Sequence, residues 1–502
     1  MPLIQTADLK PGVALPDQHQ IYNGLDCCLT LEIFEEIQRE HNQFPQVYDF
    51  ARAMQGPALD MMLRGFAIDH HERKRGIVYL GKEIERYNTI LQTFSEAIWQ
   101  KSVNPNSTKQ LQKLFYGRMK LPEQWISQKG KKTLSMNREA LEKLDTYMHA
   151  RPIVACILTI RDLAKELQTL ESELDPRTGR MHSSYNVVGT ETGRWSSSKS
   201  AYGLGLNAQN VKRKLRRMFT ADKGWKLCGI DLKQAESVEV GWLCGVLFNE
   251  WSYLDACESG DPHTLACRLI WDKLPWTGVL RDDRKIADQI FYRDFTYRDM
   301  AKRGGHGSNY YGTPFTMARH LKVPRKLMED FQEKYFDAFP GIPKYHRWVA
   351  QQLQTTRTLT TVFGRERTFF GRATDDTTLR EAIASSPQGA TADRLNLGLW
   401  RVWHHMKNVQ VLSQGYDSLY FQYREDVDEA AIIEQALKFI DIPITDPKSG
   451  RTYTVQGEAK VGWNWADVDY RKKIFPDGNP DGLTEWKGSD SRKRTSLYDR
   501  IM

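Results

Sequence analysis

The chain has 502 residues, of which 40% are hydrophobic and 27% charged, so it can bury a large core and should hold two or more subdomains. Its formal net charge of +8 favours a nucleic-acid partner only weakly. The N-terminus has no apolar core, no run approaches the roughly 18 apolar residues of a membrane span, and the seven cysteines show no regular pairing. We therefore expect a cytoplasmic protein without a membrane partner.

The first predicted elements are helices. An apolar stripe predicts a helix from Tyr22 to about residue 40, in which Tyr22 and Asp26, four residues apart, share one face. A helical pattern then covers about residues 50–185. Within it, the loop at 128–133 carries three lysines. It is either a basic hairpin tip that contacts phosphates or an ordinary solvated loop.

Polar and basic segments come next. Residues 190–197 and 207–210 read as polar loops, and the first of them carries Arg194. Over residues 212–217, five of six positions are cationic. Such a cluster is typical either of a solvated face or of a surface that contacts nucleic-acid phosphates.

Two aspartates stand at the ends of predicted strands. A mostly apolar run over 225–230 predicts a buried strand, and Asp231 follows it, either as a helix cap or as a metal ligand. Residues 411–421 read as two apolar runs broken by Gly and polar residues, which predicts a β-hairpin with Asp417 at its turn. If the fold brings the two carboxylates together, they form a two-metal site for phosphoryl transfer.

A predicted helix between these strands carries a stripe of functional side chains. Arg298, Lys302, His306 and Tyr310 recur every four residues and therefore lie along one face. This order suits a nucleoside triphosphate, with phosphates at the cationic end and the base at the aromatic end. Three glycines over 304–307 cost about 1 kcal/mol each relative to Ala, so we expect a close neighbour there, or a helix that bends or swings.

Over about residues 22–466 these segments resemble, in order, the motifs of family A DNA polymerases of the DNA polymerase I type. Residues 231–236 are similar to motif A and residues 298–312 to motif B. Motif C appears around Asp417, with Tyr-Asp-Ser in place of the usual His-Asp-Glu. The resemblance implies an α+β right-hand fold with an antiparallel-sheet palm, a helical thumb and helical fingers. It also implies an exonuclease remnant at 1–48, a thumb at 49–186, palm segments at 187–240 and 339–466, fingers at 241–338, and a flexible basic tail at 467–502.

The resemblance also implies site roles. Asp231 and Asp417, with the backbone carbonyl of Leu232, would hold two Mg²⁺ ions, for which Mn²⁺ can substitute, and Lys302 would act on the triphosphate as a catalytic residue. The implied nucleotide-binding residues are Gln234, Glu236, His263, Arg298, Lys302, His306 and Tyr310. The implied primer- and template-binding residues are Arg194, Asn207, Gln209, Asn210, Arg380, Gln388 and Tyr416.

Three departures from the family pattern leave choices open. His306 takes the aromatic position of motif B, which puts sugar discrimination there in doubt. The spacing from Lys302 favours Tyr310 as the motif B tyrosine, whereas the following Gly favours Tyr311, and we take Tyr310. Tyr22 and Asp26 resemble the last motif of 3′–5′ proofreading exonucleases. The 21 residues before it do not accommodate the other carboxylates, so the helix is either a remnant or half of a site that a partner chain completes.

The function implied is template-directed extension of a primer by dNTPs on primer-template DNA, in viral genome replication rather than repair. The chain would not proofread on its own, and a separate exonuclease or processivity factor is a further expected partner. A single-subunit RNA polymerase is the first alternative, but Glu236 would crowd a ribose 2′ position. A DNA-binding chain without catalysis is the second, for which Ser418 in place of Glu leaves room.

Overall fold

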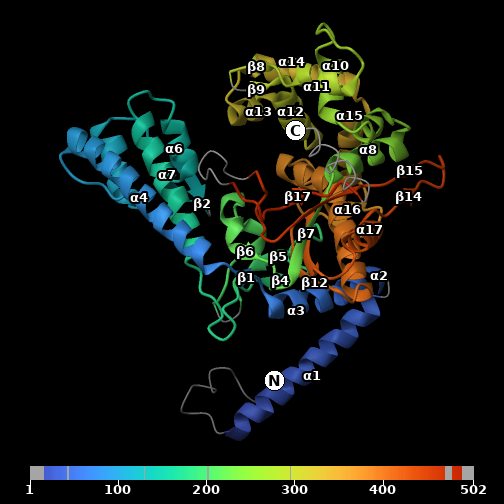
Figure 1. Cartoon of the computed structure of the whole chain (residues 1–502). Coiled ribbons are helices and arrows are strands. Elements are labelled where there is room, and N and C mark those ends of the chain that lie inside the picture. Colours follow the sequence, from blue (N-terminus) through green and yellow to red (C-terminus); the bar gives the residue numbers. More distant parts are fainter. Residues whose placement is uncertain are drawn as a thin grey trace, which may run out of the picture. The chain divides into compact units, whose positions relative to one another are not determined.

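The computed structural model describes residues 16–41, 45–128, 131–200, 203–293, 295–469 and 478–488, which divide into units at 1–56 and 57–502 (Figure 1). In the first unit, α1 (Pro16–His41) contains the predicted helix, and α2 (Pro45–Ala53) follows it. Apolar side chains of α1, including Leu29, Leu31 and Ile33, are exposed. No helix in the described ranges is long and apolar enough to cross a membrane.

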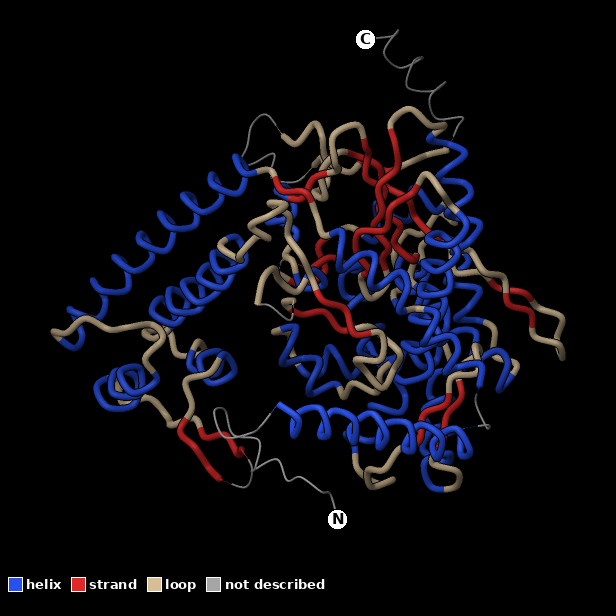
Figure 2. The backbone as a smooth tube through the Cα atoms, turned by 90° about the horizontal axis from the view of Figure 1, so that it is seen from below, coloured by secondary structure: helices blue, strands red, loops and turns tan. Residues whose placement is uncertain are grey.

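The second unit is built on a five-stranded antiparallel sheet, which Figure 2 shows among its covering helices. The order is β12 (Val409–Gln414), β13 (Ser418–Arg424), β7 (Trp225–Leu232), β16 (Gly457–Gly462) and β17 (Thr484–Glu485). Residues 227–230 of the central strand β7 are all buried, as the apolar run predicted. The helices α16 (Asp376–His405) and α17 (Glu429–Ile440) pack against this sheet, and α8 (Ala235–Phe248) packs against α16.

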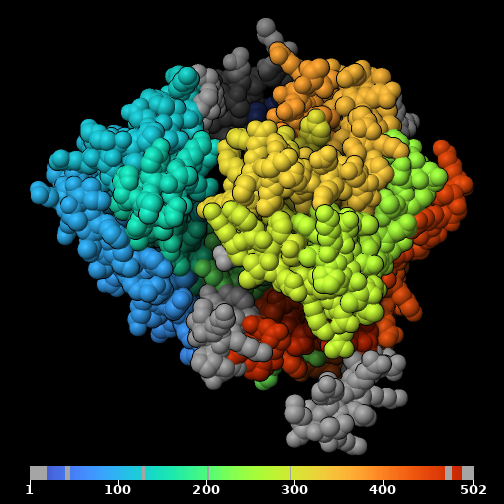
Figure 3. Space-filling model, turned by 90° about the horizontal axis from the view of Figure 1, so that it is seen from above, coloured from blue at the N-terminus to red at the C-terminus, as the bar shows by residue number. Residues whose placement is uncertain are grey.

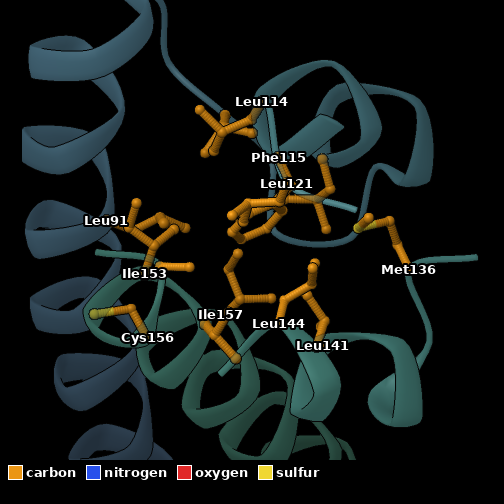
Figure 4. Packing of buried hydrophobic residues seen from close by; sticks show 14 of the residues in the cluster. Leu91, Leu114, Phe115, Leu121, Met136, Leu141, Leu144, Ile153, Cys156 and Ile157 are labelled. Carbon is orange, nitrogen blue, oxygen red and sulfur yellow. The ribbon is translucent and has the colours of Figure 1, made fainter. Parts of the chain in front are cut away.

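Residues 70–170 form a helical subdomain with its own core. The helices α4 (His70–Trp99) and α7 (Arg151–Leu170) pack side by side, and an apolar cluster fills the space beside them (Figure 4). Between them lie α5 (Thr108–Gln112), η2 (Lys113–Arg118), the hairpin β2 (Trp125–Gln128) and β3 (Lys131–Leu134), and α6 (Arg138–Leu144). Ser107 caps α5 by accepting a hydrogen bond from the Gln110 amide. Lys129 of the predicted basic tip lies outside the described residues.

Residues 252–354 form a second helical subdomain. It contains α9 (Ser252–Glu258), α10 (Pro262–Ile270), α11 (Leu280–Ala287), α12 (Tyr297–Asn309), α13 (Pro314–Leu321), α14 (Arg325–Ala338) and α15 (Gly341–Gln354), with the short strands β8 (Ile290–Tyr292) and β9 (Phe295–Thr296). In Figure 3 a crevice divides its yellow surface from the blue-to-teal surface of residues 70–170. A Cβ on Gly304 would lie 2.5 Å from the Phe331 ring, so the glycines of α12 let α14 approach closely, as expected.

The basic run at 212–217 is not a free strip of positive charge. It forms η4 (Arg213–Met218) and the residue before it. Lys212 and Lys214 both pair with the buried carboxylate of Glu166 on α7, and Arg217 pairs with Glu72 on α4 at 3.4 Å. Three of the five cations therefore fasten the two long helices to the segment that leads into β7.

The predicted flexible tail is partly ordered, which corrects the boundary at 467. Strand β17 adds to the edge of the sheet, with Thr484 opposite Val461. Asn479 is buried and exchanges amide hydrogen bonds of 2.8 and 2.9 Å with Asn464. Backbone pairing and this buried amide pair hold residues 478–488 in place. Residues 470–477 and 489–502 lie outside the described residues.

Candidate active site

The two aspartates singled out in the sequence lie at one edge of the sheet. Asp231 is the last residue but one of β7, and its cross-strand partner in β13 is Ser418. Asp417 directly precedes Ser418 in the turn between β12 and β13, and its carbonyl oxygen accepts from the Leu232 amide at 2.8 Å. Both carboxylates line the same cleft, and the charge of Asp417 acts on Asp231, so the fold brings the two together.

Asp231 is not a helix cap. The residue before α8 is Gln234, which has a φ of 51° and makes no side-chain capping bond. This left-handed residue turns the chain out of β7 and leaves the Asp231 carboxylate free to face the space beside Asp417. The cap alternative is therefore wrong for Asp231.

Desolvation, together with charge repulsion, raises the pKa of both carboxyl groups at this edge. Desolvation is the largest cause of the rise in the pKa of Asp231 to about 6, followed by the charges of Asp417 and Glu458. The pKa of Asp417 is also raised, first by desolvation and then by Glu236. Adjacent carboxylates that repel one another suit a divalent cation with a preference for oxygen ligands. Among the described residues, no three acidic, His or Cys side chains form a ready metal cluster, so this pair would be the core of the donor set.

The carboxylates open into a cleft of about 680 Å³ between β7 and α12. Its walls include the predicted metal ligands and every predicted nucleotide-binding residue except Tyr310. The predicted residues in the lining are Asp231, Leu232, Gln234, Glu236, His263, Arg298, Lys302, His306 and Asp417. Cationic side chains and an acidic pair therefore line the same cleft.

Helix α12 carries the cationic side of the cleft. A capping box between Thr296 and Asp299 fixes its start. Lys302 is exposed, whereas Arg298 is held by Asp261, with Nε and Nη2 donating to the carboxylate at 3.0 and 3.2 Å. Burial and the Arg298 charge lower the pKa of His263 to about 4, so this imidazole is neutral near pH 7.

Glu236 links the cleft to the predicted primer side. Its carboxylate accepts hydrogen bonds from the Tyr310 hydroxyl and from the Arg194 guanidinium. Arg194 also lies over the Tyr416 ring, 5.6 Å from its centroid. Tyr311 instead has a φ of 59° and meets His346 edge to face. Of the two tyrosines, Tyr310 is therefore the one that faces Glu236.

The other predicted primer and template residues are more dispersed. Asn207 caps the short helix η3 (Ala208–Asn210) by accepting from the Asn210 amide, so both residues serve local structure here. Gln209 donates to a buried glutamine. Arg380 is exposed on α16, where it pairs with Asp376 at 3.6 Å, and Gln388 is half-buried two turns further on. None of these residues lines the cleft. Tyr22 and Asp26 lie on α1, in the other unit.

The model of the family described as DNA polymerase family A matches residues 78–246 and 282–466, more than half of the chain. The chain belongs to this family. It is 27% identical over 483 residues to DNA polymerase I of Chloroflexus aurantiacus, covering 90% of this chain and 47% of that protein. It is 29% identical over 392 residues to the thermostable DNA polymerase I of Thermus filiformis, covering 73% of this chain and 42% of that protein. The family A chain thus spans about half the length of these curated relatives.

A solved structure establishes the fold. The POL domain of Pol1 from M. smegmatis, in complex with DNA primer-template and dNTP, has a TM-score of 0.66 to this chain and is 20% identical. The likeness covers 82% of this chain and 69% of that one. The predicted right-hand polymerase fold is therefore confirmed.

The sequence did not indicate Glu458 as part of this cleft. Glu458 lies opposite Asp231 on β16, lines the same cleft and pairs with Lys233 at 3.3 Å. The available signal was the alternation over 457–462, where Glu458 and Lys460 stand between buried apolar residues. That pattern predicts a strand with one charged face, but not which strand it joins.

The raised pKa of Asp231 predicts a pH-dependent stability of the metal-free chain. A folded-state pKa of about 6, above the ordinary 3.8, means that the folded chain gains stability by binding a proton. This contribution to the free energy of unfolding is fully present below about pH 4 and is lost as the pH rises through about 6. Asn at this position is neutral at every pH, so Asp231→Asn should raise the melting temperature in EDTA by about 1 to 2 °C at pH 8 and by less at pH 5. Asp426→Asn is the control and should not gain stability, because Arg424 lowers the pKa of Asp426.

Proposed function

We propose that this family A chain is a DNA polymerase that adds dNTPs to a primer 3′-OH under the direction of a template. One observation carries the proposal: the Asp231–Asp417 pair and the cationic residues of α12 line the same cleft. The names of the curated relatives and the primer-template and dNTP bound to the M. smegmatis domain support the same assignment.

The acidic pair and the cationic residues of α12 would have separate roles in catalysis. Asp231 and Asp417 would hold two Mg²⁺ ions, which supply activation of the attacking 3′-oxygen and charge stabilisation of the leaving pyrophosphate. Lys302 would lie along the triphosphate and stabilise negative charge that develops on it. Arg298, preset by its bidentate contact with Asp261, would exchange part of that ion pair for phosphate oxygens.

Primer extension tests this function against its two alternatives. A labelled DNA primer annealed to a longer template is incubated with the chain, Mg²⁺ and either dNTPs or rNTPs. We expect extension with dNTPs. Efficient extension with rNTPs alone would identify an RNA polymerase. Binding of the duplex without extension by either substrate would identify a non-catalytic DNA-binding protein, for which the retained Asp231 and Asp417 would then have no catalytic role.

Glu236 should exclude ribonucleotides. Its carboxylate is fixed by Tyr310 and Arg194 at the wall of the cleft, where it would crowd a 2′-hydroxyl. Glu236→Ala should therefore increase the use of rNTP relative to dNTP by about 10²-fold or more, because a fixed steric and polar obstacle is removed. The measurement is kcat/KM for each nucleotide in single-nucleotide extension. Glu258→Ala, at an exposed carboxylate on α9, is the control and should leave this ratio unchanged.

The wider role is part of the proposal. The altered motifs around His306 and Asp417 support a replicase of a virus, acting in the cytoplasm of an infected bacterial cell. The helix α1 presents Tyr22 and Asp26 among exposed apolar side chains, which supports a remnant that does not proofread, or a docking element for a separate exonuclease or processivity factor. Incubation of the chain alone with a 3′-labelled single strand should release no nucleotide.

A further inference from the structure

A series of hydrogen-bonded side-chain amides begins at Gln209, one of the predicted primer-binding residues. Gln209 Nε2 donates to Gln414 Oε1 at 3.0 Å, and Gln414 Nε2 donates to Asn396 Oδ1 at 3.1 Å. Asn396 Nδ2 then donates to the carbonyl oxygen of Gly193 at 3.5 Å. Gln414 and Asn396 are 0% and 1% exposed, so water does not compete for these groups. We call this set the amide relay.

One backbone atom determines which group of each amide in the relay donates and which accepts. The carbonyl oxygen of Gly193 can only accept, so Asn396 must turn its NH₂ group toward it. The Asn396 oxygen then faces Gln414, which must present its own NH₂ group, and the Gln414 oxygen in turn faces the Gln209 NH₂ group. Reversing any one amide would place two donors or two acceptors against each other at a buried site. The orientation of Gln209 is thus tied to the position of the Gly193 backbone.

The amide relay joins elements that carry predicted functional groups. Gly193 precedes Arg194, and Gln414 ends β12, three residues before Asp417. The backbone of Gly193 is also fixed from its other side, because it has a φ of 78° and a Cβ there would lie 2.6 Å from the Arg365 guanidinium carbon. Arg365 is itself held by the buried Asp393. Movement of the Arg194 loop is therefore opposed on both sides by groups with fixed partners.

We infer that Asn396 and Gln414 are positioning residues that couple the primer-terminus contacts at Arg194 and Gln209 to the hairpin carrying Asp417. The inference rests on the proposed polymerase function. A mismatched terminus displaces the minor-groove edge that Arg194 would contact, and the displacement of Gly193 passes through Asn396 and Gln414 to the turn at Asp417. Extension from a mispair is then slowed by misplacement of the carboxylate as well as of the primer.

The test compares matched with mismatched primer termini in Asn396→Leu and Asn396→Asp. Leu keeps the branched shape of Asn but has no polar atoms, and Asp keeps the size of Asn and the acceptor for Gln414 while losing the donor to Gly193. We measure kcat and KM for extension from each terminus, and binding of the same two duplexes without nucleotide by fluorescence anisotropy. Both variants should lower the matched-to-mismatched ratio of kcat/KM about tenfold, mainly through kcat on the matched primer.

Asn479→Leu is the matched control. Asn479 is also a buried Asn with amide hydrogen bonds, to Asn464, but it lies near the far edge strand β17. It should lower the melting temperature as much as Asn396→Leu does and leave the matched-to-mismatched ratio at the wild-type value. Ratios that stay at the wild-type value in both Asn396 variants, or that fall equally in the control, would overturn the coupling. A wild-type chain that extends no primer would instead overturn the proposed function. In that case the binding measurements alone test the amide relay. The ratio of affinities for the matched and the mismatched duplex, measured by anisotropy, should fall in both Asn396 variants.

Discussion

Asp417→Ala should lower the rate of primer extension by about three orders of magnitude and leave binding of primer-template DNA within about twofold of the wild type. The hairpin turn places this carboxylate beside Asp231, and removing either one leaves an incomplete set of oxygen ligands for a cation. A loss of about 4 kcal/mol of transition-state stabilisation corresponds to that factor. Neither carboxylate attracts a phosphate, so affinity for the duplex should not suffer. Single-turnover extension gives the rate, and anisotropy gives the dissociation constant.

The control for this prediction lies on the same hairpin. Asp426 follows the other end of β13, where it is exposed and paired with Arg424, so Asp426→Ala should extend primers at nearly the wild-type rate. Asp231→Ala should match Asp417→Ala, and the double variant should be hardly slower than either single variant, because the two groups act as a unit. Extension by Asp417→Ala at more than a tenth of the wild-type rate would show that the catalytic centre lies elsewhere.

Local patterns were sufficient to predict the parts of this site that lie within single elements. The strand before Asp231, the hairpin at Asp417 and the four-residue stripe on α12 each depend on contacts between near neighbours in sequence. The order of these motifs then supplied the family and the fold. The register of β7 between β13 and β16 is different, because it pairs residues more than 180 positions apart. Glu458 therefore could not be placed opposite Asp231 from the sequence.

Charged residues were the hardest to interpret, because the sequence does not show whether a charged side chain is exposed to solvent or forms an ion pair. Lys212 and Lys214 read as an exposed basic cluster, yet both contact the buried Glu166 on α7. Arg394 and Glu239 form a fully buried ion pair at 3.1 Å that ties α16 to α8, and nothing in the sequence marked either residue. Pairs of this kind depend on long-range packing, which periodicity does not encode.

Lys302→Ala should lower kcat for nucleotide addition by about 10² to 10³-fold. Lys302 is exposed on α12, lines the cleft and forms no ion pair with any residue in the described ranges, whereas Arg298 one turn earlier is already held by Asp261. Its ammonium group is therefore available for the triphosphate, where negative charge grows in the transition state. Loss of one such positioned donor typically costs a factor of this size. Lys302→Arg keeps the charge but changes its geometry, and it should recover only part of the rate.

The neighbouring Arg303 provides the control that separates catalysis from general electrostatic attraction. Arg303 is also exposed on α12, but its guanidinium lies over the Phe295 ring, 5.0 Å from the centroid, and it does not line the cleft. Arg303→Ala removes the same unit of charge from the same helix and should change kcat less than threefold. If Lys302→Ala instead raises KM for dNTP at an unchanged kcat, Lys302 binds the ground state and the transition state equally. A selective fall in kcat means that its charge acts on the leaving pyrophosphate, in the cleft that Asp231 and Asp417 also line.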